Sequence, residues 1–127
     1  MRHAVKALIE KDGKILLLHK ALDTPRFPDH WDLPGGGLEP TEETNQGVIR
    51  EVFEETSIII EPLKVIWNHQ MLVNEVIIDY RIILTKYISG EVKLSFEHID
   101  FIWISKKEAL NLKLQPYLKK YLEQSAE

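Results

Sequence analysis

Short apolar runs separated by turn residues dominate the beginning of the chain. The segments 4–10 (AVKALIE) and 15–19 (ILLLH) are rich in Val, Ile and Leu, and Asp12-Gly13 between them supplies the positive φ that a tight turn needs. They predict a β-hairpin that begins a sheet. Residues 20–34 show no clear period and contain several prolines, which predicts a long loop ending in a short strand at residues 31–33.

A second group of strands is expected after residue 57. The segments 58–73 and 75–88 are rich in β-branched and aromatic residues, which predicts antiparallel strands. Ser89-Gly90 turns the chain into a further expected strand at 91–95. Residues 96–105 then predict an acidic loop followed by a last strand.

The C-terminal end of the chain predicts two helices. Ser105 is a good N-cap for a short helix over 106–112, and an amphipathic helix over 116–123 places Leu118 and Leu122 on its core side. No repeat or linker interrupts the pattern. With 127 residues and 44% hydrophobic content, the chain predicts a single domain spanning 1–127.

Residues 43–56 give the clearest helix prediction, with three candidate N-caps: Thr41, Glu43 and Thr44. The helical repeat places Glu51, Glu54 and Glu55 on one exposed face. The apolar residues expected on the opposite face are Val48, Ile49, Val52 and Phe53. Because like charges at this spacing repel, the face gains stability only when cations bridge it. Oxygen ligands of this kind suit a hard cation, Mg²⁺ or Mn²⁺.

The overall charge excludes some functions. Sixteen Lys and Arg against 20 Asp and Glu give a net charge of -4, which argues against binding a nucleic acid polymer or an anionic membrane. The absence of Cys excludes disulfides and thiolate metal sites and is compatible with a reducing compartment. No segment approaches the roughly 20 apolar residues of a membrane span. A soluble, cytoplasmic protein is therefore expected.

Gly35, Gly36 and Gly37 stand directly before the acidic helix. Without side chains, this stretch brings its backbone close to a ligand and offers it amides or a carbonyl. Phosphate bound by the glycines beside metal bound by the glutamates explains the juxtaposition. A plainer alternative is that the glycines only turn the chain and the glutamates form a solvated face, and composition alone favours this alternative.

The spacing of these residues resembles the signature of the Nudix (MutT-like) hydrolases. The signature runs from Gly36 to Ile58 and includes Glu42 and the Arg50-Glu51 pair, and eight of its nine specified positions match. The departure is Ser57, where the family pattern has Gly. A Gly there ends the helix in a left-handed conformation, so Ser57 is expected to cost about 1 kcal/mol of stability rather than to change the chemistry.

The resemblance implies an α/β fold, an α/β/α sandwich with a mixed central sheet, and a reaction. The reaction is hydrolysis of a nucleoside diphosphate linked to another group, by attack of water at phosphorus. The cofactor implied is Mg²⁺, with Mn²⁺ as a substitute. The charge of -3 on Glu51, Glu54 and Glu55 would repel a diphosphate and one Mg²⁺ leaves it negative, so more than one ion is expected when substrate is bound. By the family pattern, the principal ligands are Glu54 and Glu55, Glu51 is a further ligand, and the Gly36 carbonyl and Glu42 are accessory.

Further candidates lie at and beyond the signature. Arg50 is expected to orient a neighbouring glutamate, with an ordinary i,i+4 surface pair to Glu54 as the alternative. In related enzymes the general base comes from the signature helix or from a later loop, and Glu97 is the loop candidate, ahead of His98. The alternative for Glu97 is a plain turn residue. Arg26 is a candidate contact to phosphate or sugar, and Trp31 a candidate stacking partner for a base. The plainer expectations are that Arg26 is a solvated loop charge and that Trp31 is a core residue.

Three functions remain open from the sequence. The first is a pyrophosphohydrolase acting on a small nucleoside diphosphate derivative, such as a (d)NTP, ADP-ribose or a nucleotide sugar. The second is a catalytically silent Nudix-fold module that binds a nucleotide or regulates a partner. The third is an unrelated acidic domain that binds cations structurally, although the chain lacks an EF-hand loop. Exposed strands make a homodimer plausible.

Overall fold

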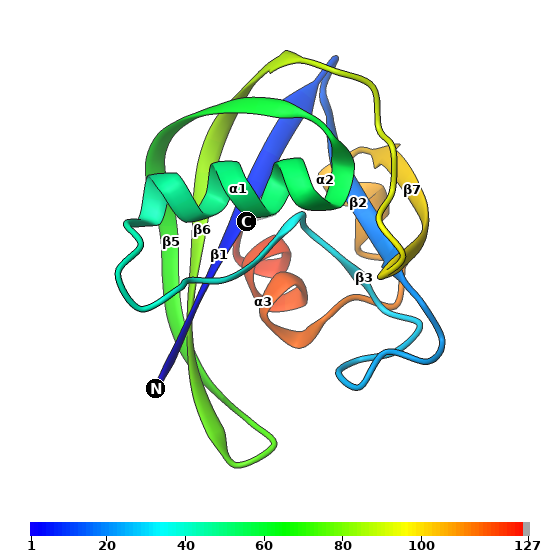
Figure 1. Cartoon of the computed structure of the whole chain (residues 1–127). Coiled ribbons are helices and arrows are strands. Elements are labelled where there is room, and N and C mark those ends of the chain that lie inside the picture. Colours follow the sequence, from blue (N-terminus) through cyan, green and yellow to red (C-terminus); the bar gives the residue numbers. More distant parts are fainter. Residues whose placement is uncertain (126–127) are drawn as a thin grey trace.

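The computed structural model describes residues 1–125 and forms an α/β/α sandwich (Figure 1). The elements in chain order are β1 (Arg2–Lys11), β2 (Lys14–Lys20), β3 (Trp31–Asp32), β4 (Gly35–Gly37), α1 (Thr44–Thr56), β5 (Ile59–Val73), β6 (Val76–Ser89), β7 (His98–Ile104), α2 (Lys106–Ala109) and α3 (Pro116–Ser125). No helix within this part of the chain is long and apolar enough to cross a membrane.

The sheet is mixed, as expected. Its strands follow the order β3-β2-β1-β6-β5, with β4 paired to β1 and β7 paired to β2. Strands β1 and β6 are parallel, whereas the other pairs are antiparallel. The predicted hairpin between β1 and β2 is confirmed, and both Asp12 and Gly13 have the positive φ of its turn. The antiparallel pair β5 and β6 is confirmed as well.

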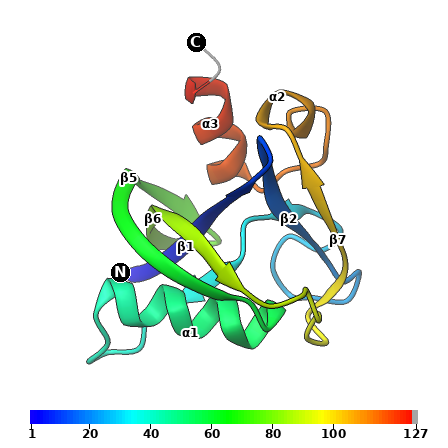
Figure 2. The ribbon, with the colours of Figure 1, turned by 90° about the horizontal axis from the view of Figure 1, so that it is seen from above.

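Two hydrophobic cores fill the two sides of the sheet. Figure 2 shows α1 on one side of the strands and α3 on the other. One core lies under α1 and includes Val5, Val48 and Val52. The other lies under α3, where the predicted core residues Leu118 and Leu122 are 0% and 1% exposed. Each layer of helix therefore buries one face of the same sheet, which is the sandwich that the sequence predicts.

Two local predictions are wrong. Residues 91–95 form no strand, because their backbone amides bond to the end of α1 instead: Lys93 N–H donates to the Thr56 carbonyl over 2.9 Å. On α1, Ile49 and Phe53 were expected on the buried face but are 40% and 51% exposed. Val48 and Val52, each 0% exposed, are the α1 side chains that enter the core on this side of the sheet.

The end of α1 carries the strain that the sequence predicts. Ser57 has φ 64 and ψ 12, the left-handed conformation, and its N–H donates to the Phe53 carbonyl. For a residue with a side chain this conformation costs about 1–2 kcal/mol, whereas Gly adopts it freely.

Ser57→Gly is therefore expected to stabilise the protein. The unfolded chain gains freedom from the added Gly, so the net rise in the free energy of unfolding is about 0.5–1 kcal/mol. Urea denaturation of both proteins measures the difference. A variant less stable than the wild type would show that the Ser57 side chain makes a favourable contact that outweighs its backbone strain.

Candidate active site

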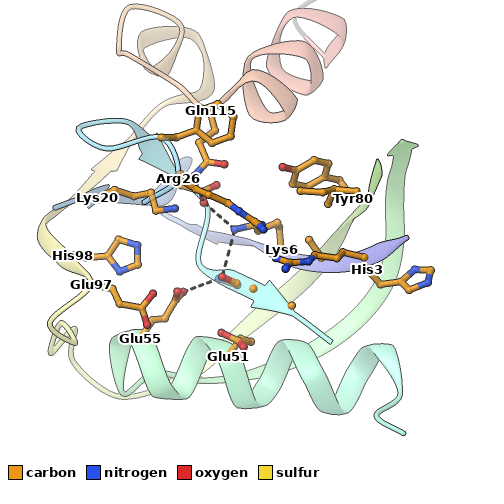
Figure 3. A pocket seen from close by; sticks show the side chains of 18 of the residues that line it. His3, Lys6, Lys20, Arg26, Glu51, Glu55, Tyr80, Glu97, His98 and Gln115 are labelled. Carbon is orange, nitrogen blue, oxygen red and sulfur yellow. Dashed lines mark hydrogen bonds and ion pairs between the residues drawn. The ribbon is translucent and has the colours of Figure 1, made fainter. Parts of the chain in front are cut away.

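A cavity of about 350 Å³ opens between α1, strand β4 and the first half of β1 (Figure 3). Strand β6 and two loops close its remaining sides. Its lining residues are Arg2, His3, Ala4, Lys6, Lys20, Arg26, Phe27, Asp32, Gly35, Gly36, Gly37, Glu51, Glu54, Glu55, Ile78, Tyr80, Glu97, His98 and Gln115. The structure thus brings the three glutamates of α1, the glycines, Arg26 and Glu97 together around one cavity.

The three glutamates of α1 all line this cavity but differ in exposure. The side chain of Glu54 is 57% exposed and that of Glu51 is 17% exposed, whereas Glu55 is 6% exposed. The expectation of one exposed acidic face is therefore wrong for Glu55. Strand β4 covers it, and the Gly35 N–H donates to Glu55 Oε1 over 2.8 Å.

Burial changes the acidity of these glutamates. It raises the pKa of Glu55 from 4.5 to about 8, although nearby Lys6 and the Gly35 amide act in the opposite direction. Burial also raises the pKa of Glu51, partly opposed by Arg50. Glu55 is consequently protonated in much of the protein near neutral pH and must lose this proton to bind a cation.

Arg50 connects the helix to the loop before it. Its Nε donates to Glu42 over 2.6 Å, and its terminal nitrogens donate to Glu51 over 3.0 Å, to Glu54 over 3.2 Å and to the Gly37 carbonyl over 3.2 Å. Arg50 therefore does more than form an i,i+4 surface pair with Glu54. Its planar guanidinium fixes the orientation of two of the candidate ligands.

Glu42, expected as an accessory metal ligand, is engaged by Arg50 in this structure. Both of its carboxylate oxygens accept hydrogen bonds from Arg50, over 2.6 Å and 2.8 Å, and it does not line the cavity. The bond to Arg50 holds the pKa of Glu42 down at about 2. In this structure Glu42 fixes Arg50, and through it the orientation of the helix glutamates.

The lack of a side chain at Gly36 leaves the space that the Glu51 carboxylate occupies. A Cβ on Gly36 would stand 2.6 Å from Glu51 Oε2, so only a glycine leaves room for this carboxylate against the strand. Gly35 has φ +141, and a Cβ there would stand 2.1 Å from the Val5 carbonyl oxygen. The three glycines do not merely turn the chain, as the plainer alternative had it, but form strand β4 paired with β1. The Gly35 N–H donates to the Glu55 carboxylate.

A buried polar cluster forms the floor of the cavity opposite α1. Lys6 Nζ donates to Asp32 Oδ2 over 2.8 Å, and Gln115 Nε2 donates to the same oxygen over 2.9 Å. The Tyr117 hydroxyl donates to the other oxygen. Burial disfavours the charge of Lys6, but Asp32, together with Glu55 when it is ionised, outweighs burial and raises the pKa of this lysine. A permanent positive charge thus faces the glutamates.

The loops supply the remaining side chains of the site. Lys20, at the end of β2, and Arg26 add positive charge, and Figure 3 shows Lys20 beside His98 and Glu97. Trp31 does not line the cavity. It stacks on His19 with ring centroids 4.5 Å apart and packs against the core, which favours the plainer expectation for this residue.

The donor atoms on α1 fit a hard divalent cation. Within residues 1–125, no three His, Cys, Asp or Glu side chains form a cluster that could hold an ion unaided. Arg50 and the Gly35 amide engage the glutamates instead. Mg²⁺, however, commonly binds one or two carboxylates and completes its shell with waters and substrate phosphates. Three carboxylates around one cavity satisfy that requirement.

Sequence reasoning missed the floor of the cavity. Lys6 interrupts an apolar strand, and Asp32 stands between apolar neighbours. A charged residue at a position expected to be buried is a detectable signal in the sequence, and both residues are buried. Gln115 gave no such signal. Its bond to Asp32 joins residues 83 positions apart.

Comparison with known proteins places these features in a family. The model described as NUDIX domain matches residues 1–124. A CTP pyrophosphohydrolase of Escherichia coli (strain K12) is 33% identical over 116 residues, which cover 91% of this chain and 84% of that protein.

Solved structures agree with the family match. The crystal structure of a MutT protein from Methanosarcina mazei Go1 has a TM-score of 0.89 at 33% identity, covering 97% of this chain and 91% of the other. The solution structure of the E. coli ORF135 protein has a TM-score of 0.87 at 32% identity, covering 99% and 89% of the two chains. The similarity therefore spans the whole fold and is not confined to the signature.

Proposed function

The chain belongs to the Nudix family of hydrolases, and we propose that it cleaves a diphosphate linkage in a nucleoside diphosphate derivative with Mg²⁺ or Mn²⁺ as cofactor. One observation carries the proposal: in a single cavity, the glutamates of α1 face the positive charges of Lys6, Lys20 and Arg26. A carboxylate face alone repels a diphosphate. Cations on the opposite wall attract it and leave the glutamates to hold the metal.

A nucleoside triphosphate, cleaved to a monophosphate and pyrophosphate, is the substrate class we favour. It is supported by the CTP pyrophosphohydrolase that shares 33% identity with the chain. Space for the rest of a substrate lies next to the site, where a second cavity of about 640 Å³ shares Arg2, Lys20, Arg26 and Glu97 with the first. Two joined cavities accommodate the two ends of a molecule that is cleaved in its middle.

We assign different roles in the reaction to the residues in and beside the cavity. Glu51, Glu54 and Glu55, with the Gly36 carbonyl, would hold Mg²⁺, which when bound supplies neutralisation of phosphate charge and activation of water. Arg50 orients two of these carboxylates. The positive side chains on the opposite wall hold the diphosphate in place, so that its phosphorus is presented to the attacking water.

Glu97 is proposed as the group that takes a proton from the attacking water. It lines the cavity on the loop before β7 and is an exposed residue, so water reaches it. Glu97→Gln is expected to lower kcat about 100-fold or more while KM changes little, because an amide cannot accept the proton.

Steady-state kinetics on Glu97→Gln tests this role. Glu91→Gln is the matched control, since Glu91 is an exposed glutamate of the same connecting segment and does not line the cavity. If both variants turn over like the wild type, Glu97 is an ordinary turn residue and the base lies on α1.

A substrate panel tests the proposed function as a whole. Release of phosphate, pyrophosphate or nucleoside monophosphate is measured with Mg²⁺ and Mn²⁺ for four classes: nucleoside triphosphates, ADP-ribose, nucleotide sugars and dinucleoside polyphosphates. Turnover of one class that is lost in Glu54→Gln is the expected result. Nucleotide binding without turnover of any class would contradict the proposal and favour a catalytically silent module.

A further inference from the structure

His98 is a buried side chain whose hydrogen-bonding capacity the fold does not use. It is the first residue of β7, is 6% exposed and lines the cavity beside Lys20 and Glu97 (Figure 3). Its Nδ1 is fully buried and finds no hydrogen-bond partner among residues 1–125. Buried polar atoms in folded proteins are nearly always paired, so this side chain calls for a physical explanation.

The position of the ring proton follows from the unpaired nitrogen. A neutral imidazole carries one N–H, and a buried N–H without an acceptor destabilises the fold. With Nδ1 unpaired, the favoured tautomer places the proton on Nε2 and leaves Nδ1 as the bare nitrogen. The nitrogen that remains able to donate is Nε2.

The surroundings keep this ring neutral. Burial lowers the pKa of His98 to about 4, and although Asp32 favours the charged form, Lys6, Lys20 and His19 oppose it. Glu97 precedes His98 on the loop and lines the same cavity. Near pH 7 His98 is therefore a hydrogen-bond donor that adds no charge to the cavity. Its protonation state stays the same between pH 6 and pH 8.

We propose that His98 is a further substrate-binding residue, whose Nε2–H donates a hydrogen bond to an oxygen of the substrate diphosphate. The proposal rests on the proposed function, since it names a contact to the group that is cleaved. His98 lies on the side of the cavity where Lys20 adds positive charge, and an anionic oxygen is the acceptor that this side attracts. A neutral donor there binds phosphate without repelling the cation held by α1.

Nitrogen NMR on the whole protein tests the contact without turnover. Long-range ¹H–¹⁵N spectra of the free protein are expected to show the Nε2–H tautomer of His98. Adding Mg²⁺ with imidodiphosphate, a diphosphate that resists hydrolysis, is expected to shift the Nε2 resonance, whereas cytidine, which lacks phosphate, leaves it in place. A ring protonated at Nδ1, or an Nε2 resonance that responds to cytidine but not to imidodiphosphate, overturns the proposal.

Two variants test the same contact by kinetics. His98→Gln places an amide donor near the position of Nε2 and is expected to keep kcat/KM within about threefold of the wild type, whereas His98→Phe keeps a ring without a donor and is expected to lose about 10- to 100-fold. Equal losses in both variants, with both folded, overturn the proposal. If the wild type hydrolyses nothing, the proposed function fails, while the NMR experiment still decides whether His98 binds diphosphate.

Discussion

Glu55→Gln is expected to abolish turnover and, at the same time, to make the fold more stable above pH 6. Turnover falls because an amide is a poor ligand for Mg²⁺; losing about 4 kcal/mol of charge stabilisation in the transition state lowers the rate about 10³-fold. Stability rises because Glu55 is 6% exposed and its charged form is costly there. The Gly35 N–H still finds an oxygen acceptor in the variant.

The direction of the stability effect depends on pH. Burial raises the pKa of Glu55 from 4.5 to about 8, so between these values the folded wild type retains a proton that the unfolded chain has lost. The free energy of unfolding of the wild type therefore falls by up to about 1.4 kcal/mol for each pH unit in this window. A glutamine does not titrate, so the advantage of the variant is small at pH 5 and largest near pH 8.

Urea denaturation at pH 5 and pH 8 in the presence of a chelator measures this effect. Glu54→Gln is the matched control, because the side chain of Glu54 is 57% exposed. That variant is expected to lose turnover with little change in stability at either pH. A Glu55→Gln protein that is no more stable than the wild type at pH 8 would contradict the burial of a titrating carboxylate, and retained turnover would contradict its role as a ligand.

Substituting alanine at each glycine of β4 is expected to give three different results. In Gly35→Ala the new Cβ meets backbone at 2.1 Å, on a residue with φ +141. Backbone cannot yield as a side chain does, so we expect a loss of about 3 kcal/mol or more in the free energy of unfolding. In Gly36→Ala the Cβ meets only the flexible end of Glu51, at 2.6 Å.

Gly36→Ala is therefore expected to fold normally but to lose turnover about 10- to 100-fold, because the displaced carboxylate no longer faces the metal site. Gly37→Ala is the control for stability, since nothing lies within 4 Å of its Cβ. Thermal denaturation and kinetics of the three variants give the comparison. A Gly35→Ala protein as stable as Gly37→Ala would contradict the close pairing of β4 with β1, and full activity of Gly36→Ala would contradict the role of Glu51.

The sequence was sufficient to predict most of the fold because the relevant signals are local. The Asp12-Gly13 turn, the N-cap at Ser105 and the apolar spacing of Leu118 and Leu122 each depend on neighbouring residues, and the structure confirms them. Residues 91–95 were predicted wrongly for the opposite reason. They satisfy their backbone by bonding to the end of α1, a contact that no local pattern records.

The candidate site was predictable in part. Spacing on one helix places Glu51, Glu54 and Glu55 together, and their part in metal binding stays a prediction. Helical spacing does not reveal what covers each residue, so the burial of Glu55 under β4 could not be anticipated. The Lys6–Asp32 pair joins β1 to β3 and depends on the tertiary fold, although a charge within an apolar strand marks both positions.

Hydrolysis in H₂¹⁸O tests the central claim most directly. The best substrate of the panel is incubated with the wild type and Mg²⁺, and the products are examined by mass spectrometry, with Glu55→Gln alongside. Attack of water at phosphorus predicts one ¹⁸O atom per turnover, bound to phosphorus in one of the two products, and about 10³-fold slower formation of labelled product by the variant. Label on carbon, or no hydrolysis of any of the four substrate classes, would contradict a Nudix hydrolase acting through this cavity.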